Sequence, residues 1–219
     1  MRGDSCSALL APLTPQIIEV LNDIERMEKD WFIPDYPTDH SYGRVPGEKE
    51  LRFWSVPAST GLLLYSLIQA KKPRVILEIG ASAGYSAIWM GAAATTYGGR
   101  LFTVEICPEK IDIAKANIAR AGLEQTISLI PGDAIEISRT WEPSLPIDFA
   151  FLDADKENYH TYLRNLAPYM SKDALLCADN ALDYRSLMLE FIAAAKTQSA
   201  FESLTLNLDN GILILCPKV

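Results

Sequence analysis

The sequence has 219 residues, 49% of them hydrophobic, which is enough apolar material for the core of one large domain. Its 20 basic and 28 acidic side chains give a net charge of −8, and no basic block occurs, which argues against nucleic acid as a partner. No apolar run is long enough to cross a membrane, and the beginning of the chain lacks the basic and apolar regions of a secretory leader. We therefore expect a cytoplasmic protein with a single domain over residues 1–219.

The first 57 residues predict a helix followed by a covering segment. Thr14 and Pro15 are typical of a helix start, and apolar residues then recur at helical spacing to about Glu28. Residues 31–54 mix prolines and glycines with aromatic side chains. This segment is either a strap that closes one end of the core or part of a lid over a substrate, and both interpretations stay open. The core itself is expected over residues 58–219.

From residue 58 onwards, helices and strands are expected to alternate. A helix over 58–70 leads into a strand at 75–79, and further helices begin near Tyr85 and at Pro108. More strands are expected at 101–105, 126–130, 147–152 and 174–178, and a hairpin around Asn210-Gly211 at 203–216. This pattern is typical of a doubly wound α/β fold, with a mostly parallel seven-stranded sheet, helices on both faces and a C-terminal antiparallel hairpin.

The strand at 75–79 runs directly into a glycine loop and a helix. The spacing is Glu78-x-Gly80-x-x-x-Gly84, which differs from the Gly-x-Gly-x-x-Gly loop that seats a dinucleotide pyrophosphate. A carboxylate at this place repels a pyrophosphate but suits a cationic ligand, such as the amino group and sulfonium of S-adenosylmethionine. A second interpretation is an ordinary turn between a strand and a helix that happens to contain glycines.

Acidic residues recur where the predicted strands end, at Glu78, Glu105, Asp133, Asp153 and Asp179. Because the carboxyl ends of parallel strands meet at one edge of a sheet, we expect these side chains to converge there. An acid at the end of the second strand is placed to accept hydrogen bonds from ribose hydroxyls, which gives Glu105 a candidate role.

A second group of polar residues follows the fourth and fifth predicted strands. Asp153, Asp179 and Asn180 supply only oxygen ligands, which suit Mg²⁺ or Ca²⁺ and suit Zn²⁺ poorly. A calcium-binding EF-hand is excluded, because Asn158 stands where its glycine belongs and Arg164 stands where its bidentate glutamate belongs.

Two motifs together carry a family resemblance. They are Asp153-Ala154-Asp155-Lys156-x-Asn158-Tyr159 and Ala178-Asp179-Asn180. With the glycine loop, they resemble the class I S-adenosylmethionine-dependent methyltransferases, and within these the metal-dependent O-methyltransferases of the caffeoyl-CoA and catechol type. The resemblance extends from about Val56 to Lys218.

The resemblance implies a role for each matched residue. Asp153, Asp179 and Asn180 would bind a divalent cation, with Mg²⁺ expected first and Ca²⁺ or Mn²⁺ as alternatives, and Lys156 would be the general base. The cofactor S-adenosylmethionine would lie among residues from the other strand ends: Glu105 at the ribose, Gly80, Ser82, Tyr85 and Ser86 around the methionine part, Asp133 and Ala134 near the adenine, and Glu78 at the amino end. A homodimer and a small aromatic hydroxyl acceptor are further implications.

Methyl transfer to a phenol requires its deprotonation, because a phenol of pKa about 10 is mostly neutral at pH 7. A cation at the hydroxyl oxygens and a base at Lys156 would meet this requirement. The alternatives are a cofactor-binding protein without catalysis, a methyltransferase with a non-catechol acceptor, and a nicotinamide oxidoreductase, which the loop spacing excludes. For single residues, the alternatives are a surface lysine at Lys156 and a helix cap at Asp153.

The chain departs from the family pattern after Asn180. Only Ala181 and Leu182 separate it from Asp183, a plausible helix cap, and apolar residues at helical spacing follow. We therefore expect a short wall and an open acceptor site on that side, closed if at all by the aromatic segment Trp31 to Trp54, with Trp54 as the ring that faces the acceptor.

Overall fold

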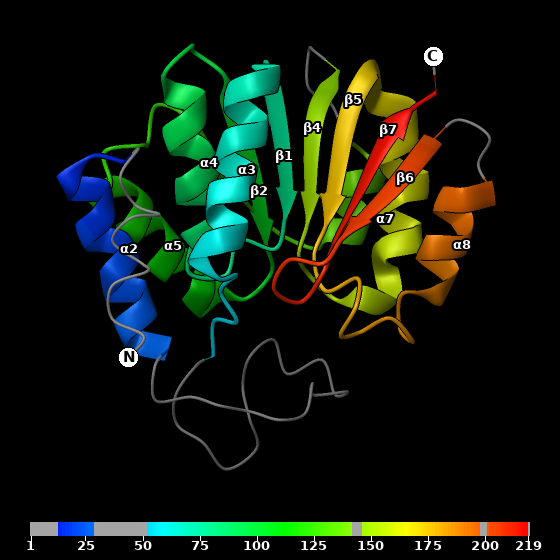
Figure 1. The fold of residues 1–219 in the computed structure, drawn as a ribbon. Helices are drawn as coiled ribbons and strands as arrows, with labels where there is room; N and C mark the ends of the chain where they lie inside the picture. Colours follow the sequence, from blue (N-terminus) through cyan, green and yellow to red (C-terminus); the bar gives the residue numbers. More distant parts are fainter. Residues whose placement is uncertain (1–12, 29–51, 142–145, 198–200, 219) are drawn as a thin grey trace.

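A mostly parallel sheet of seven strands lies at the centre of the computed structural model, which describes residues 13–28, 52–141, 146–197 and 201–218 (Figure 1). The strand order is β3-β2-β1-β4-β5-β7-β6, with β7 antiparallel to both of its neighbours. The strands are β1 Val75–Ile79, β2 Arg100–Glu105, β3 Ile127–Pro131, β4 Ile147–Leu152, β5 Met170–Ala178, β6 Phe201–Leu206 and β7 Ile212–Pro217. The predicted fold class is confirmed.

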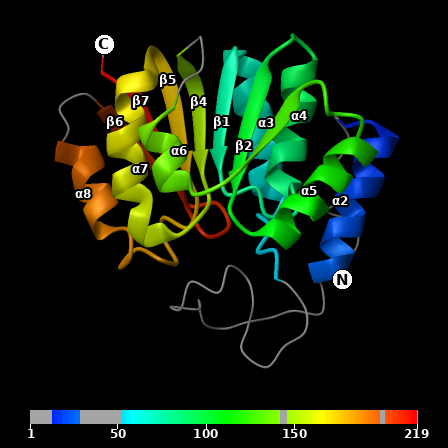
Figure 2. The same cartoon turned by 180° about the vertical axis from the view of Figure 1, so that it is seen from behind.

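Helices cover both faces of this sheet, as Figures 1 and 2 show from opposite sides. One face carries α2 Pro15–Glu28, α3 Ala58–Lys71, α4 Tyr85–Thr95 and α5 Pro108–Arg120. The other carries α6 Ala134–Arg139, α7 Tyr159–Leu166 and α8 Leu189–Thr197, with short 3₁₀ turns at η1 Lys156–Asn158 and η2 Ala167–Tyr169. None of the helices in these ranges combines the length and the apolar character that a membrane crossing requires.

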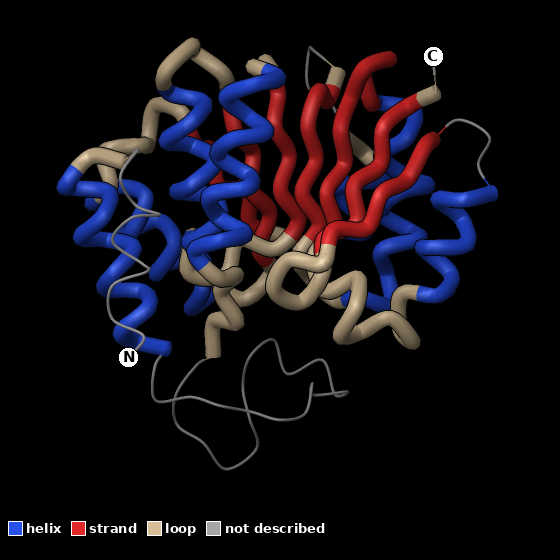
Figure 3. The backbone as a smooth tube through the Cα atoms, in the orientation of Figure 1, coloured by secondary structure: helices blue, strands red, loops and turns tan. Residues whose placement is uncertain are grey.

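The strand order explains where a ligand can bind. All five residues of β1 are buried, and β1 pairs in parallel with β2 on one side and β4 on the other. Because the chain leaves β1 and β4 in opposite directions along the sheet, their loops diverge and open a crevice at the carboxyl edge. Figure 3 shows loops gathered at that lower edge, and the turn between β6 and β7 lies there too.

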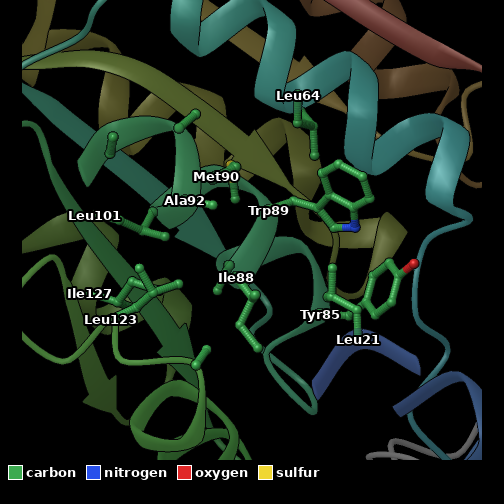
Figure 4. Packing of buried hydrophobic residues seen from close by; sticks show 14 of the residues in the cluster. Leu21, Leu64, Tyr85, Ile88, Trp89, Met90, Ala92, Leu101, Leu123 and Ile127 are labelled. Carbon is green, nitrogen blue, oxygen red and sulfur yellow. The ribbon is translucent and has the colours of Figure 1, made fainter. Parts of the chain in front are cut away.

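Trp89 anchors the packing of α4 between the sheet and the outer helices (Figure 4). Ten consecutive residues of α4 are buried, so this helix is apolar all round, as expected of an interior helix. Leu64 of α3 and Leu21 of α2 belong to the same buried cluster as the indole (Figure 4). Gly61 of α3 makes room for it, because a Cβ there would lie 2.5 Å from Trp89 Nε1.

The structure differs from the sequence-based prediction mainly after Asn180. Residues 181–188 form turns, and the helix begins at Leu189 rather than near Asp183. The backbone N–H of Ala181 donates to the carbonyl of Gly211, and that of Leu182 to the carbonyl of Asn210, so the hairpin turn holds this segment away from a helix. The short helix α6 was also not predicted. Residues 29–51, most of the aromatic segment, lie outside the described residues, and the single-domain division stays a prediction.

Replacing Gly61 with alanine tests the packing around Trp89. In an exposed helix, alanine is more favourable than glycine by about 1 kcal/mol. Here the added Cβ meets the buried indole, so Gly61→Ala should instead lower the free energy of unfolding by about 1–3 kcal/mol. Urea unfolding measures this, with exposed Ser66→Ala of the same helix as the control. A stabilised Gly61→Ala protein would contradict the described contact.

Candidate active site

A cavity of about 580 Å³ opens at the carboxyl edge of the sheet. Its wall combines the loops that follow β1, β2, β3, β4 and β5, as the strand order requires. It includes these predicted site residues: Gly80, Ser82, Tyr85, Ser86, Glu105, Asp133, Ala134, Asp153, Lys156, Asp179 and Asn180. Glu78 is the predicted site residue that the wall does not include. Segments far apart in the sequence therefore meet in one cavity.

The glycine loop approaches the loop after β4 at backbone distance. Gly80 has a φ of 99°, and a Cβ on it would overlap the carbonyl oxygen of Asp153. The N–H groups of Gly80 and Ala81 both donate to the carbonyl of Val104, at 3.0 Å. Glycine is thus required by the close approach and by the left-handed conformation together.

Glu105 holds the glycine loop against the end of β2. Its carboxylate accepts hydrogen bonds from the N–H groups of Ser82, Ile106 and Cys107, at 2.8, 3.0 and 2.9 Å. A carboxylate offers about four acceptor positions, so one is left for a ligand in the cavity. Asp133 also has a structural task, because it caps α6 by accepting from Ile135 N at 2.7 Å.

Glu78 lies inside β1 and is completely buried. The hydroxyls of Ser86 and Thr103 each donate to its carboxyl group at 2.5 Å. Burial raises the pKa of Glu78 to about 8, although these two hydrogen bonds act in the opposite direction. The expected convergence of five acids at the edge is therefore correct for four. Glu78 reaches the cavity wall only through Ser86, and its contact with the amino end of a cofactor stays a prediction.

The candidate metal ligands combine a paired and an unpaired carboxylate. Asp153 Oδ1 accepts from Lys156 Nζ at 2.8 Å, while Asp179 Oδ1 is buried without a hydrogen-bond partner among the described residues. Burial raises the pKa of Asp179 to about 7, and the neighbouring carboxylate of Asp153 adds to the effect. A cation would relieve both costs, and the donors are all oxygens, so the residues fit a hard divalent ion.

The third member of this set is an amide. Asn180 is 7% exposed and has a φ of 65°, a left-handed conformation that asparagine tolerates better than most residues. In the described ranges, no three His, Cys, Asp or Glu side chains come together in a way that could hold a metal ion. A site at this edge therefore depends on Asn180 as well as on the two carboxylates.

Lys156 is buried at the cavity, with only 5% of its side chain exposed. Its Nζ lies 5.3 Å from the centre of the Tyr159 ring. The alternative of a surface lysine is therefore wrong. Asp155, between Asp153 and Lys156, accepts hydrogen bonds from Tyr162 Oη, at 2.5 Å, and from the amide of Asn158, and so holds the turn that carries the lysine.

The sequence profile of the O-methyltransferase family matches residues 44–210, a span that contains every residue of this cavity. The chain belongs to the O-methyltransferase family. The resemblance inferred from the two motifs is thereby confirmed at the level of the family, that of S-adenosylmethionine-dependent O-methyltransferases.

Individual relatives agree with this assignment. The chain is 38% identical over 130 residues to a catechol O-methyltransferase of Niastella koreensis, and the match spans 58% of each protein. It is 32% identical over 168 residues to a catechol O-methyltransferase of Mycobacterium tuberculosis, covering 77% of this chain and 76% of that one. The solved O-methyltransferase of Bacillus cereus, in complex with SAH, has the same fold, with a TM-score of 0.75, 24% identity, and coverage of 97% and 94%.

The O-methyltransferase cavity also contains residues that the sequence did not single out for the site. Lys110 of α5, Tyr184 of the turns after β5, and Asn210 of the hairpin turn line it, together with residues 53–56. Lys110 lies in the first turn of α5, shortly after Glu105. This closeness in sequence to a predicted site residue is the one signal that could have indicated Lys110. At Asn210, the sequence predicted a turn but indicated no function.

Replacing Glu78 with glutamine tests whether the buried carboxyl group of Glu78 holds a proton in the folded O-methyltransferase. Its pKa rises from an ordinary 4.5 to about 8, so between these values the folded chain keeps a proton that the unfolded chain has lost. The free energy of unfolding of the wild type should therefore fall as the pH rises through this range. Glu78→Gln removes the titration and should gain stability relative to the wild type from about pH 5 to pH 8.

Urea unfolding at several pH values measures this difference, with the exposed Glu124→Gln as the matched control. A stability difference for Glu78→Gln that does not vary with pH would show that the carboxyl group ionises normally in the folded protein.

Proposed function

We propose that this O-methyltransferase moves the methyl group of S-adenosylmethionine to a hydroxyl oxygen of a small catechol-like or phenolic acceptor, with a divalent cation, Mg²⁺ being expected. One observation carries the proposal. Buried Lys156 pairs with Asp153 beside Asp179, whose Oδ1 has no hydrogen-bond partner among the described residues, in the same cavity as the glycine loop and Glu105. A base and an oxygen ligand set thus face a cofactor loop.

The cofactor half would be formed by the loops after β1, β2 and β3. Glu105 keeps one acceptor position for a ribose hydroxyl, and the side chain of Ile106, 37% exposed, offers an apolar surface at the same place. Asp133 and Ala134 lie further along, at the end of β3, where the resemblance puts the adenine. The acidic wall suits a cationic cofactor.

The metal half would be formed by Asp153, Asp179 and Asn180. A divalent cation held there would draw electron density from acceptor hydroxyl oxygens, make them more acidic, and fix their position. Ca²⁺ or Mn²⁺ would suit the same donors.

Lys156 would take the proton of the reacting hydroxyl. An ammonium has no lone pair, so Lys156 would act only as the free amine. The hydroxyl oxygen then gives an electron pair to the methyl carbon, while the carbon–sulfur bond breaks and its electrons stay on sulfur. The products are the methyl ether and S-adenosylhomocysteine, and the proton is left on Lys156.

The acceptor side is walled by a part of the chain that the sequence did not indicate. Tyr184 and Asn210 line the cavity there, and the carbonyl of Asn210 accepts from the N–H groups of Leu182 and Asp183, at 3.0 and 3.3 Å. The expectation of a short wall and an open acceptor site, closed if at all by the aromatic segment, stays a prediction, because residues 29–51 lie outside the described residues. Trp54 does line the cavity, and its facing the acceptor stays a prediction.

Two alternatives remain testable. One is a protein of this fold that binds S-adenosylmethionine without catalysis, and the other is a methyltransferase with a non-catechol acceptor. The burial of Lys156 and its pair with Asp153 favour catalysis, and the catechol O-methyltransferases among the relatives favour the acceptor. A homodimer and a cytoplasmic location complete the proposal, and size-exclusion chromatography tests the first.

Removing the cation or Asp179 should stop turnover. Asp179 serves the acceptor side, so Asp179→Ala or excess EDTA should abolish methylation of catechol and leave the affinity for S-adenosylhomocysteine largely intact. Radiolabel transfer and calorimetry measure the two effects, with the exposed Asp183→Ala as the control. Full activity in EDTA would remove the metal from the proposal.

Replacing Lys156 should affect the chemical step. Lys156→Met keeps the volume of the buried stem and loses the base, so kcat should fall by about 10²- to 10⁴-fold with little change in cofactor affinity. The exposed Lys172→Met is the matched control. Activity close to wild type would leave Lys156 with a structural role only.

A further inference from the structure

Lys110 is a buried cation that the mechanism above does not use. It lies in the first turn of α5, is 5% exposed, and lines the cavity. Its Nζ makes no hydrogen bond or ion pair within the part of the chain that the structure describes. The contact it does make is with Trp54, whose ring centre lies 5.0 Å from Nζ.

This arrangement is costly without a ligand. An ammonium taken out of water needs acceptors for three hydrogens, and an indole ring compensates for only a small part of the lost hydration. Burial accordingly lowers the pKa of Lys110, against the opposing effect of the Glu105 carboxylate. Because Lys110 lines the cavity, a molecule bound there can supply the acceptor that the described residues do not.

The position of Lys110 indicates which part of a ligand it meets. It belongs to α5, which follows Glu105 directly and packs against β2 and β3. The candidate metal ligands follow β4 and β5, on the other side of β1. Lys110 therefore lies in the cofactor half of the cavity, near the carboxylate expected at the ribose.

We propose that Lys110 donates hydrogen bonds to the ribose oxygens of S-adenosylmethionine, while Glu105 accepts a hydrogen bond from a ribose hydroxyl. A hydroxyl both donates and accepts, so a diol can satisfy an acid and an ammonium at the same time. The nucleoside would thus be held by a donor as well as by an acceptor. This inference rests on the proposed function.

Trp54, which is held by its neighbours, lies over Lys110. The carbonyl of Phe53 accepts from Ser82 Oγ at 2.6 Å, and Ser55 N donates to the carboxylate of Glu28 at 2.9 Å. These bonds fix Trp54 between the glycine loop and α2, in a left-handed conformation with a φ of 50°. Its side chain is 41% exposed, so a ligand beside Lys110 would also cover indole surface.

Calorimetric titration with S-adenosylhomocysteine tests the proposal. Lys110→Met keeps the stem and removes the donor, and the dissociation constant should rise about 10- to 100-fold, as expected for a lost hydrogen bond to a charged group. The dissociation constant of Lys110→Gln, which keeps an N–H donor, should lie between those of the wild type and of Lys110→Met. The control is Lys115→Met, an exposed lysine of the same helix, which should bind as the wild type does.

A melting curve separates this role from a structural one. Lys110→Met replaces a buried, unpaired ammonium by a thioether, so the ligand-free variant should melt no lower than the wild type. Its stabilisation by S-adenosylhomocysteine should be smaller than that of the wild type. A ligand-free protein that melts lower, with undiminished affinity, would show that Lys110 only packs, and would overturn the proposal.

A second ligand identifies the contacted group. 5′-Methylthioadenosine contains the ribose and lacks the amino-acid part, so Lys110→Met should weaken both ligands by the same factor. A loss confined to S-adenosylhomocysteine would assign Lys110 to the methionine carboxylate instead. Unchanged cofactor binding, with a selective loss of kcat/KM for 3,4-dihydroxybenzoate against catechol, would assign it to an anionic acceptor. Both results would overturn the proposal. If the wild type binds neither nucleoside, the proposed function itself fails.

Discussion

The backbone contact between Gly80 and Asp153 is the constraint on which the site depends. It presses the loop after β1 against the loop after β4, so closely that a Cβ at Gly80 would overlap the Asp153 carbonyl. Asp153 N donates to the carbonyl of Ile79 at 2.9 Å, which continues the sheet ladder up to this point. The loop assigned to the cofactor and the turn that carries Lys156 are thereby fixed relative to each other by backbone atoms, which move less than side chains do. In-line transfer between two bound molecules needs this kind of positional control.

Around this contact, the cavity contains polar groups that no described residue satisfies. Among the described residues, Asp179 Oδ1 has no hydrogen-bond partner, and the ammonium of Lys110 lies against the Trp54 ring without an acceptor. Natural cores rarely leave such groups, because each costs free energy of folding. Their concentration at one edge, above a sheet whose central strand β1 is fully buried, is typical of a site that gives up stability for binding.

The sequence predicted those helices and strands whose conformation is determined by their own residues. β4 occurs at Ile147–Leu152 as expected, because five of its six residues are apolar and buried, as is typical of a strand covered on both faces. The helix expected after Asn180 failed, because hydrogen bonds to Asn210 and Gly211, distant in sequence, compete with local helical bonds. That Glu78 lies inside β1 and does not line the cavity could not be foreseen, since a strand-end acid and an inward-facing one look alike in sequence. The burial of Lys110 was not predictable either, because Trp54, which covers it, comes from another part of the chain.

The hairpin turn has a consequence for the order in which the enzyme matures during synthesis. The loops that would bind the cofactor leave the ribosome well before the turn that holds Asn210. Ser59 and Thr60, at the start of α3, donate hydrogen bonds to Asp209 at 2.5 and 2.7 Å. These two donors are synthesised early, and their acceptor is synthesised late. Domains fold as units once their chain is available. A nascent chain would therefore gain the contacts of Asn210 after the loops that would bind the cofactor.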